Sequence, residues 1–131
     1  GAALNGFMVT LLNLRGAAAT LSRPPESLED DTAPSPVAAR AADRARRLAD
    51  DGIETLTRHI PDHDTGTWTF YGMLSGGRPW RTYLADLNYH CYHIHLLGRL
   101  ADVYPDHGFT AVADRWSRYV AAARLTCRER G

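Results

Sequence analysis

The sequence predicts an all-α protein built from two antiparallel helical hairpins, with a short extended insert around residues 67–72. Two observations carry this prediction. Apolar residues recur every three or four positions in four stretches of the 131-residue chain, which is the period of an amphipathic helix. Alternation of apolar and polar residues, the pattern of half-buried strands, is scarce. A β-sandwich or an α/β fold is therefore excluded.

The first hairpin is expected to consist of helices at residues 4–19 and 35–60. One face of the first helix gathers Leu4, Phe7, Leu11 and Leu14. A Pro-rich acidic loop follows, and Ser35 with Pro36 then supplies an N-cap and a first-turn proline. The predicted buried side of the second helix comprises Val37, Ala41, Ala45, Leu48, Leu56 and Ile60. Its Arg and Asp residues predict a solvated face.

The second hairpin is expected from a helix at residues 81–104 and a last helix after Pro105–Asp106. The helix at 81–104 carries two apolar or aromatic stripes, which predicts burial on more than one side. Pro105–Asp106 is expected to end it and to cap the last helix. That last helix has a single stripe of Phe109, Val112, Trp116, Tyr119 and Ala123. Between the hairpins, residues 67–71 are β-branched and aromatic and predict a strand or extended segment.

Charge and cysteine content restrict the function classes. Fifteen basic and fifteen acidic residues give a net charge of zero, so nothing favours a nucleic-acid partner. No run approaches the roughly 20 apolar residues that cross a membrane. All basic residues are Arg, which together with the abundance of Ala favours a GC-rich bacterial genome as the source. Cys91 and Cys127 lack CxxC spacing, so two free thiols are expected.

Tyrosines and histidines are concentrated between residues 70 and 95. The simplest interpretation is that a large buried helix uses them as partly polar core residues. A metal site is a second interpretation, because His90 and His93 are three residues apart and Cys91 and His95 four. The two pairs point in different directions, however, and no HExxH frame accompanies them. The sequence therefore predicts neither a metal nor a cofactor.

A hydrolase is a third interpretation, and it has less support. A Ser-His-Asp enzyme of the common type would show a G-x-S-x-G elbow, and the sequence has none. Asp62 and Asp64 flank a turn after the second predicted helix. They are expected to form that turn and not to act as a catalytic acid pair.

Five short motifs occur in order along the chain. They are Asn5-Gly-Phe-Met, Gly52-Ile-Glu-Thr-Leu, Asp64-Thr-Gly-x-x-Thr-x-Tyr71, Tyr89-His-x-x-His-Ile-x-x-Leu97 and Arg115-Trp-x-x-Tyr119. Together they resemble the C-terminal domain of D-glucuronyl C5-epimerases, enzymes that make iduronate in heparin-like polysaccharides. The resemblance implies that residues 1–131 form a single domain, a segment of a longer protein that supplies the last two helical hairpins of an (α/α) toroid.

The resemblance also implies roles for individual residues. Tyr71 and Tyr89 stand where the family has two active-site tyrosines, and they are the catalytic candidates. Asn5 matches a substrate-facing asparagine. His90 and His93 match two histidines that follow the second tyrosine. They are expected to belong to the substrate-binding site by holding in place the residues that contact the substrate.

The sequence departs from the family pattern at one position. Another catalytic residue of the family has no counterpart in this sequence. The family's substrate-binding arginine, three residues after the first tyrosine, is replaced by Leu74, and Arg78 or Arg81 is the expected substitute. A further catalytic tyrosine, preceded by Glu, lies in the family upstream of the position of Asn5.

Tyrosines suit an epimerase because the reaction moves a proton at C5, next to a carboxylate, and needs an acid or base on each side of the sugar. A phenol has an ordinary pKa of about 10, so a phenolate is a strong base and the phenol can return the proton. A polysaccharide lyase with the same first step and a non-catalytic sugar-binding module remain alternatives. The expected partners are a uronate polysaccharide and either a second copy of the chain or further domains, without nucleic acid or membrane.

Overall fold

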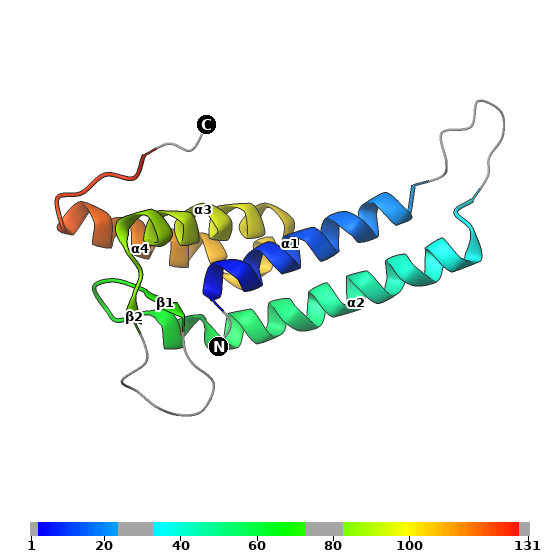
Figure 1. Ribbon diagram of the computed structural model, residues 1–131, viewed down its shortest axis with the longest axis horizontal. Helices are drawn as coiled ribbons and strands as arrows, with labels where there is room; N and C mark the ends of the chain where they lie inside the picture. The colour runs from blue at the N-terminus through cyan, green and yellow to red at the C-terminus, as the bar shows by residue number, and fades with distance from the viewer. Residues whose placement is uncertain (1–2, 24–32, 73–82, 129–131) are drawn as a thin grey trace. The chain divides into compact units, whose positions relative to one another are not determined.

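The computed structural model describes residues 3–23, 33–72 and 83–128 (Figure 1). Over these residues it consists of four α-helices and one two-stranded antiparallel sheet. The elements are α1 (Leu4–Leu21), α2 (Pro36–His59), β1 (Phe70–Gly72), β2 (Tyr83–Leu84), α3 (Leu87–Val103) and α4 (Phe109–Ala122). Short 3₁₀ turns, η1 (Ile60–His63) and η3 (Pro105–His107), follow α2 and α3. The all-α prediction is confirmed.

The chain divides into two compact units, one formed by Thr10–Leu56 and the other by the residues before and after this range. Within Thr10–Leu56, Leu11 of α1 fills the space beside Gly52 of α2, where an added Cβ would overlap the leucine side chain. Ser22 Oγ lies 3.4 Å from the guanidinium of Arg46. Later residues of α1 therefore meet earlier residues of α2, so this hairpin is antiparallel, and its close approach depends on the missing side chain at position 52.

The start of α2 agrees with the prediction, and its buried side agrees only toward the end of the predicted helix, where Leu56 and Ile60 are buried. Ser35 Oγ accepts a hydrogen bond from the backbone N–H of Ala38 at 3.1 Å, which is the predicted N-cap. The buried residues of the helix are Ala42, Ala49, Ile53 and Leu56, whereas Val37 and Leu48 are 69% and 50% exposed. Alanines on every side of this helix make its apolar stripe ambiguous, and the contact at Gly52 decides the orientation.

The second hairpin begins later than predicted. α3 starts at Leu87, because β2 occupies Tyr83–Leu84 and Asp86 then caps the helix by accepting a hydrogen bond from the Tyr89 N–H at 2.8 Å. At its other end, Gly108 has a φ of 75° and serves as the N-cap of α4 in place of the predicted Asp106. This left-handed conformation favours glycine. The buried residues of α3 come from both predicted stripes.

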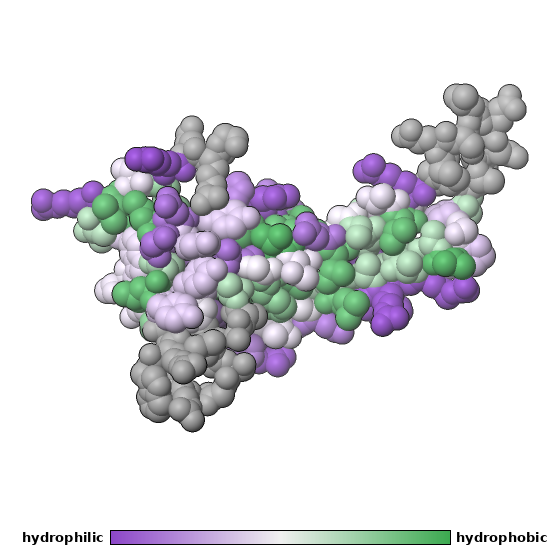
Figure 2. Space-filling view, viewed as in Figure 1, coloured by the Kyte–Doolittle hydropathy of each residue, from purple (hydrophilic) through white to green (hydrophobic). Residues whose placement is uncertain are grey.

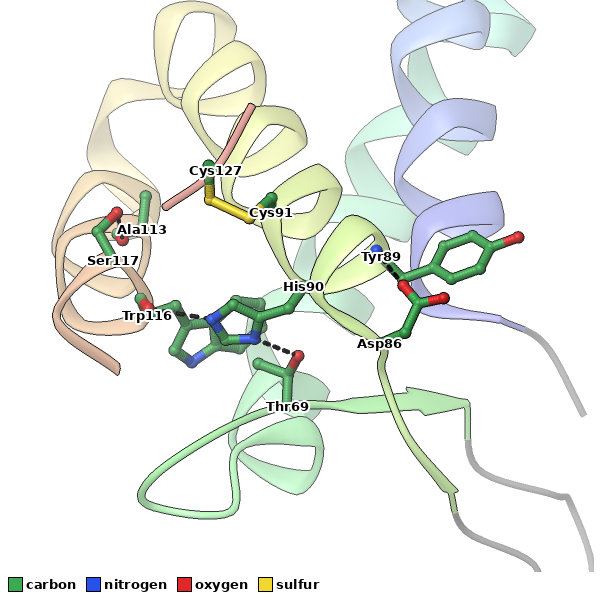
Figure 3. Close-up of a disulfide and its surroundings, with 9 residues drawn as sticks. All are labelled: Thr69, Asp86, Tyr89, His90, Cys91, Ala113, Trp116, Ser117 and Cys127. Atoms are coloured by element: carbon green, nitrogen blue, oxygen red, sulfur yellow. Dashed lines mark hydrogen bonds between the residues drawn. A yellow bond between two sulfur atoms is a disulfide. The ribbon is translucent and has the colours of Figure 1, made fainter. Parts of the chain in front are cut away.

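Cys91 and Cys127 form a disulfide, so the expectation of two free thiols is wrong (Figure 3). Their Cα atoms are 5.6 Å apart, within the usual range for a bridged pair. Helices α3 and α4 pack against each other as a hairpin, which returns the chain after α4 to the first turns of α3. A pairing across 36 positions leaves no local spacing signal in the sequence. Among the described helices, none is both long and apolar enough to cross a bilayer.

Candidate functional site

Strand β1 holds Tyr71 between the start of α1 and the segment that leads into α3. Phe70 pairs with Leu84 and Gly72 with Tyr83, with an irregularity between the two pairs. On the other side, Ala3 forms an isolated bridge with Gly72. The insert predicted as extended is thus a strand, and it has a partner strand that was not predicted.

The structure brings the two predicted catalytic tyrosines together. The ring centroids of Tyr71 and Tyr89 are 4.5 Å apart, with planes inclined by 58°. The ring centroid of Tyr83, on β2, lies 6.5 Å from that of Tyr71. Partial burial, then the charge and hydrogen bond of Tyr89, raise the pKa of Tyr71 above its ordinary value. Tyr71 is therefore a phenol at neutral pH, and Tyr89 is exposed beside it.

Asn5 lies in the first turn of α1, two residues after the backbone that bridges β1. It follows Ala3, whose backbone bridges the residue after Tyr71. The Oδ1 atom of Asn5 is buried and has no hydrogen-bond partner among the described residues. A buried acceptor without a partner is a position where a further donor, such as a water molecule or a ligand hydroxyl, is expected. Arg78 and Arg81, the predicted substitutes for the family's arginine, lie outside the described residues.

His90 and His93 of α3 are fully buried. Nδ1 of His90 lies 2.8 Å from the hydroxyl of Thr69, and its Nε2 lies 3.0 Å from the carbonyl oxygen of Trp116. Burial lowers the pKa of His90, and it lowers the pKa of His93 to about 3. Both histidines are therefore neutral at physiological pH, and both contact protein groups in this structure.

Trp68 also connects the insert to α3, in addition to the Thr69–His90 hydrogen bond. Its ring stacks on His90 with centroids 3.9 Å apart and planes inclined by only 11°. Its Nε1–H donates to the carbonyl of Ala85 at 2.7 Å, and the Ala85 N–H donates to the carbonyl of Thr69 at 2.9 Å. The segment that leads into β1 is thus hydrogen-bonded to Ala85, in the segment that leads into α3.

Asp64 ties the turn before β1 to α4. Its Oδ2 accepts from Arg115 Nε at 2.8 Å and from Trp116 Nε1 at 2.9 Å, and its Oδ1 accepts from the Tyr119 hydroxyl at 3.0 Å. The N–H of Gly66 also donates to Oδ1, at 2.8 Å. The side chain is only 10% exposed. Asp64 forms the turn, as predicted, and it also organises three side chains of α4.

Comparison with known proteins places this geometry in a family. A model of the D-glucuronyl C5-epimerase C-terminus matches residues 3–118. The chain belongs to this family. A D-glucuronyl C5-epimerase from Caenorhabditis elegans is 28% identical over 121 residues, which cover 92% of this chain and 18% of that protein. The chain therefore spans less than a fifth of that relative. No solved structure matches it significantly.

The part that matches the epimerase family contains Asn5, Tyr71, Tyr89 and the Asp64 turn, and it ends before Cys127. Sequence reasoning missed two residues of the site. Thr69 belongs to a quoted motif but carried no assigned role. Asp86 lay inside a predicted helix, although an Asp three residues before the helical Tyr89 is an N-cap signal.

The described residues contain no group of three His, Cys, Asp or Glu side chains that could hold a metal ion. Cys91, half of one of the two ligand pairs considered from the sequence, is engaged in the disulfide. His90, from the other pair, is bonded through both ring nitrogens.

Proposed function

We propose that this chain carries part of the active site of a uronic-acid C5-epimerase, which interconverts D-glucuronate and L-iduronate residues in a heparosan-like polysaccharide. The observation that carries the proposal is the pair of tyrosines, Tyr71 and Tyr89, whose rings lie 4.5 Å apart on separate elements. Membership of the epimerase family supports the reaction class. The C. elegans relative, a D-glucuronyl C5-epimerase by name, supports a glucuronate substrate.

The proposed reaction needs one base and one acid. The base takes the C5 proton while the bonding electrons move toward the uronate carboxylate, and the acid then returns a proton to C5. Two phenols in contact disfavour ionising together, because a second phenolate would face the first. The raised pKa of Tyr71 supports it as the member of the pair that stays protonated beside the base. Tyr89, in the first turn of α3, is then the proposed base.

The ring spacing sets how the sugar meets these tyrosines. A pyranose between two rings would need about 7 to 8 Å, twice the usual carbon–carbon contact distance. At 4.5 Å, Tyr71 and Tyr89 approach the sugar from one side or from adjoining edges. We infer that the group serving the opposite face lies outside the described residues. The family's upstream Glu-Tyr pair is the candidate.

Two further contacts to the substrate are proposed. The uronate carboxylate must be neutralised, since its charge opposes the carbanion-like state, and Arg78 and Arg81 are the nearest arginines in the sequence to the tyrosine pair. The unpartnered Oδ1 of Asn5 would accept a hydrogen bond from a sugar hydroxyl. No cofactor enters this proposal, because an enolate-like intermediate is formed and consumed by proton transfer alone.

Tyr71→Phe and Tyr89→Phe are each expected to lower the rate of epimerisation by about 100- to 10,000-fold, the usual contribution of one acid–base group. The measurement is the rate of deuterium entry at C5 of a glucuronate polysaccharide in D2O. Tyr104→Phe, at the far end of α3, is the matched control and should retain the wild-type rate. Equal rates in all three variants would remove the tyrosines from the mechanism.

The same assay separates epimerisation from the two alternatives. A lyase would release unsaturated uronate with its ultraviolet absorption, and a binding module would retain oligosaccharide without deuterium entering C5. The matched family and the C. elegans relative are both named as epimerases, so neither alternative is favoured.

We also propose that the chain completes its fold by association, as part of a toroid. Figure 2 shows apolar surface among charged side chains over the later part of α1 and the start of α2. Val37 and Leu48 on α2 are 69% and 50% exposed, and an apolar patch that includes them would favour a protein partner. Sedimentation at high concentration is expected to show a dimer that Val37→Asp with Leu48→Asp dissociates. A wild-type monomer would refute self-association.

A further inference from the structure

Thr69 is a fully buried polar residue that joins the two elements carrying the tyrosines. It precedes Tyr71 by two positions, and its hydroxyl lies 2.8 Å from Nδ1 of His90, the residue after Tyr89 (Figure 3). The same hydroxyl lies 3.3 Å from Nδ1 of His93, one turn further along α3. The Thr69 hydroxyl, just before β1, is therefore within hydrogen-bond distance of two histidines of α3.

These hydrogen bonds determine which nitrogen of each histidine carries the proton. The carbonyl of Trp116 can only accept, so Nε2 of His90 donates to it. Burial lowers the pKa of His90, and a neutral imidazole has one N–H, so its Nδ1 accepts from the Thr69 hydroxyl. The Thr69 oxygen has lone pairs left and accepts from Nδ1–H of His93.

Only one direction of this chain pairs every N–H and O–H in it, and it leaves the buried Nε2 of His93 as an acceptor without a partner among the described residues. If His93 carried its proton on Nε2, that buried N–H would have no partner among the described residues, and two lone pairs would face each other at Nδ1 and Thr69. The donors therefore run from His93 through Thr69 and His90 to the Trp116 carbonyl. A group that both donates and accepts is required in the middle. Serine provides it and valine does not.

We propose that Thr69 is a positioning residue of the site: its hydroxyl, acting through His90, holds Tyr71 against Tyr89. The consequence for catalysis rests on the proposed epimerase function, whereas the geometric role does not. The stacking of Trp68 on His90 holds the same imidazole in place. Thr69 touches neither tyrosine ring in any contact described above, so its effect is transmitted by backbone position.

The test compares Thr69→Val, which removes the hydroxyl at nearly constant size, with Thr69→Ser, which keeps it. Nitrogen NMR of the full chain is expected to show His90 protonated on Nε2 and His93 on Nδ1, in the wild type and in Thr69→Ser. In Thr69→Val the pKa of Tyr71, measured on carbon-13-labelled tyrosine, is expected to fall toward its ordinary value as the tyrosines separate.

Val120→Ala, a truncation of a buried side chain in α4, is the matched control. It should lower the melting temperature while leaving the histidine protonation pattern and the pKa of Tyr71 unchanged. A merely structural role for Thr69 predicts the same for Thr69→Val, and that result would overturn the inference. So would His93 protonated on Nε2 in the wild type.

Catalysis supplies a separate readout. Deuterium entry at C5 is expected to fall about 100-fold in Thr69→Val through a lower kcat, because a small misplacement of reacting groups has effects of this size. Thr69→Ser should restore it. Failure of the wild-type chain to exchange C5 would count against the proposed function, whereas the NMR readouts decide the role of Thr69 by themselves.

Discussion

Replacement of Cys91 and Cys127 by serine is expected to lower the free energy of unfolding by about 3 to 4 kcal/mol. The disulfide closes a loop across 36 positions, and a loop of this length restricts the unfolded chain by that amount in the chain-entropy estimate. The bridge also fastens the segment after α4 to the first turns of α3 (Figure 3). A loss of this size should lower the melting temperature by roughly 10 to 15 °C.

The measurement is thermal or urea unfolding with and without reductant. Reductant should destabilise the wild type to the level of the double serine variant and leave that variant unchanged. Two reactive thiols in the denatured, unreduced wild type would contradict the disulfide. Disulfides persist in oxidising compartments, so their presence in the isolated protein also bears on where it functions.

Asp64→Asn is expected to lower the free energy of unfolding by about 2 to 4 kcal/mol, because hydrogen bonds to a charged acceptor contribute about 1.5 to 3 kcal/mol each. Asparagine keeps one acceptor oxygen and turns an amide toward donors that need acceptors, at Trp116, Tyr119 or Arg115. Asp62→Asn is the matched control from the same turn. Asp62 is exposed and pairs with exposed His59, so its loss should change stability by less than about 1 kcal/mol.

The effect of Asp64 is expected to depend on pH. Burial acts to raise the pKa of this carboxyl, and hydrogen bonds from Trp116, Gly66, Tyr119 and Arg115 outweigh it, so the pKa lies below its ordinary value of 3.8. A depressed pKa means that the carboxylate stabilises the fold above pH 3.8 and that this contribution is lost as the pH falls through the folded-state pKa. The difference between wild type and Asp64→Asn should be constant near pH 7 and shrink below pH 4. A difference independent of pH would contradict this.

The helices were predictable where their signals are local. Ser35 and Pro36 mark the start of α2 in the sequence, and the structure has the N-cap there. The order of the motifs also brought Tyr71 and Tyr89 forward as a pair before any geometry was known. Periodicity alone would have left Tyr89 as a core residue of a buried helix and Tyr71 as part of an extended insert.

The features that were not predicted depend on contacts between distant positions. The Cys91–Cys127 bridge needs the α3–α4 hairpin to form first, and the buried side of α2 is decided by Leu11 against Gly52. The Asp64 cluster spans about fifty positions, and turn chemistry accounts for only the bond to Gly66. Local periodicity carries no information about these long-range contacts. For this reason it predicted too early a start for α3 and did not predict β2, the strand that pairs with β1.

The most direct test of the tyrosine mechanism is proton NMR of a glucuronate-rich polysaccharide incubated with the chain in D2O. We expect the C5 proton signal to decline as deuterium enters, at a rate that both Tyr71→Phe and Tyr89→Phe suppress. Iduronate signals would show in addition that the opposite face of the sugar is served. A C5 proton that stays in place with the wild-type chain, or that exchanges at the wild-type rate in both phenylalanine variants, would contradict the assignment of these two tyrosines as acid–base residues.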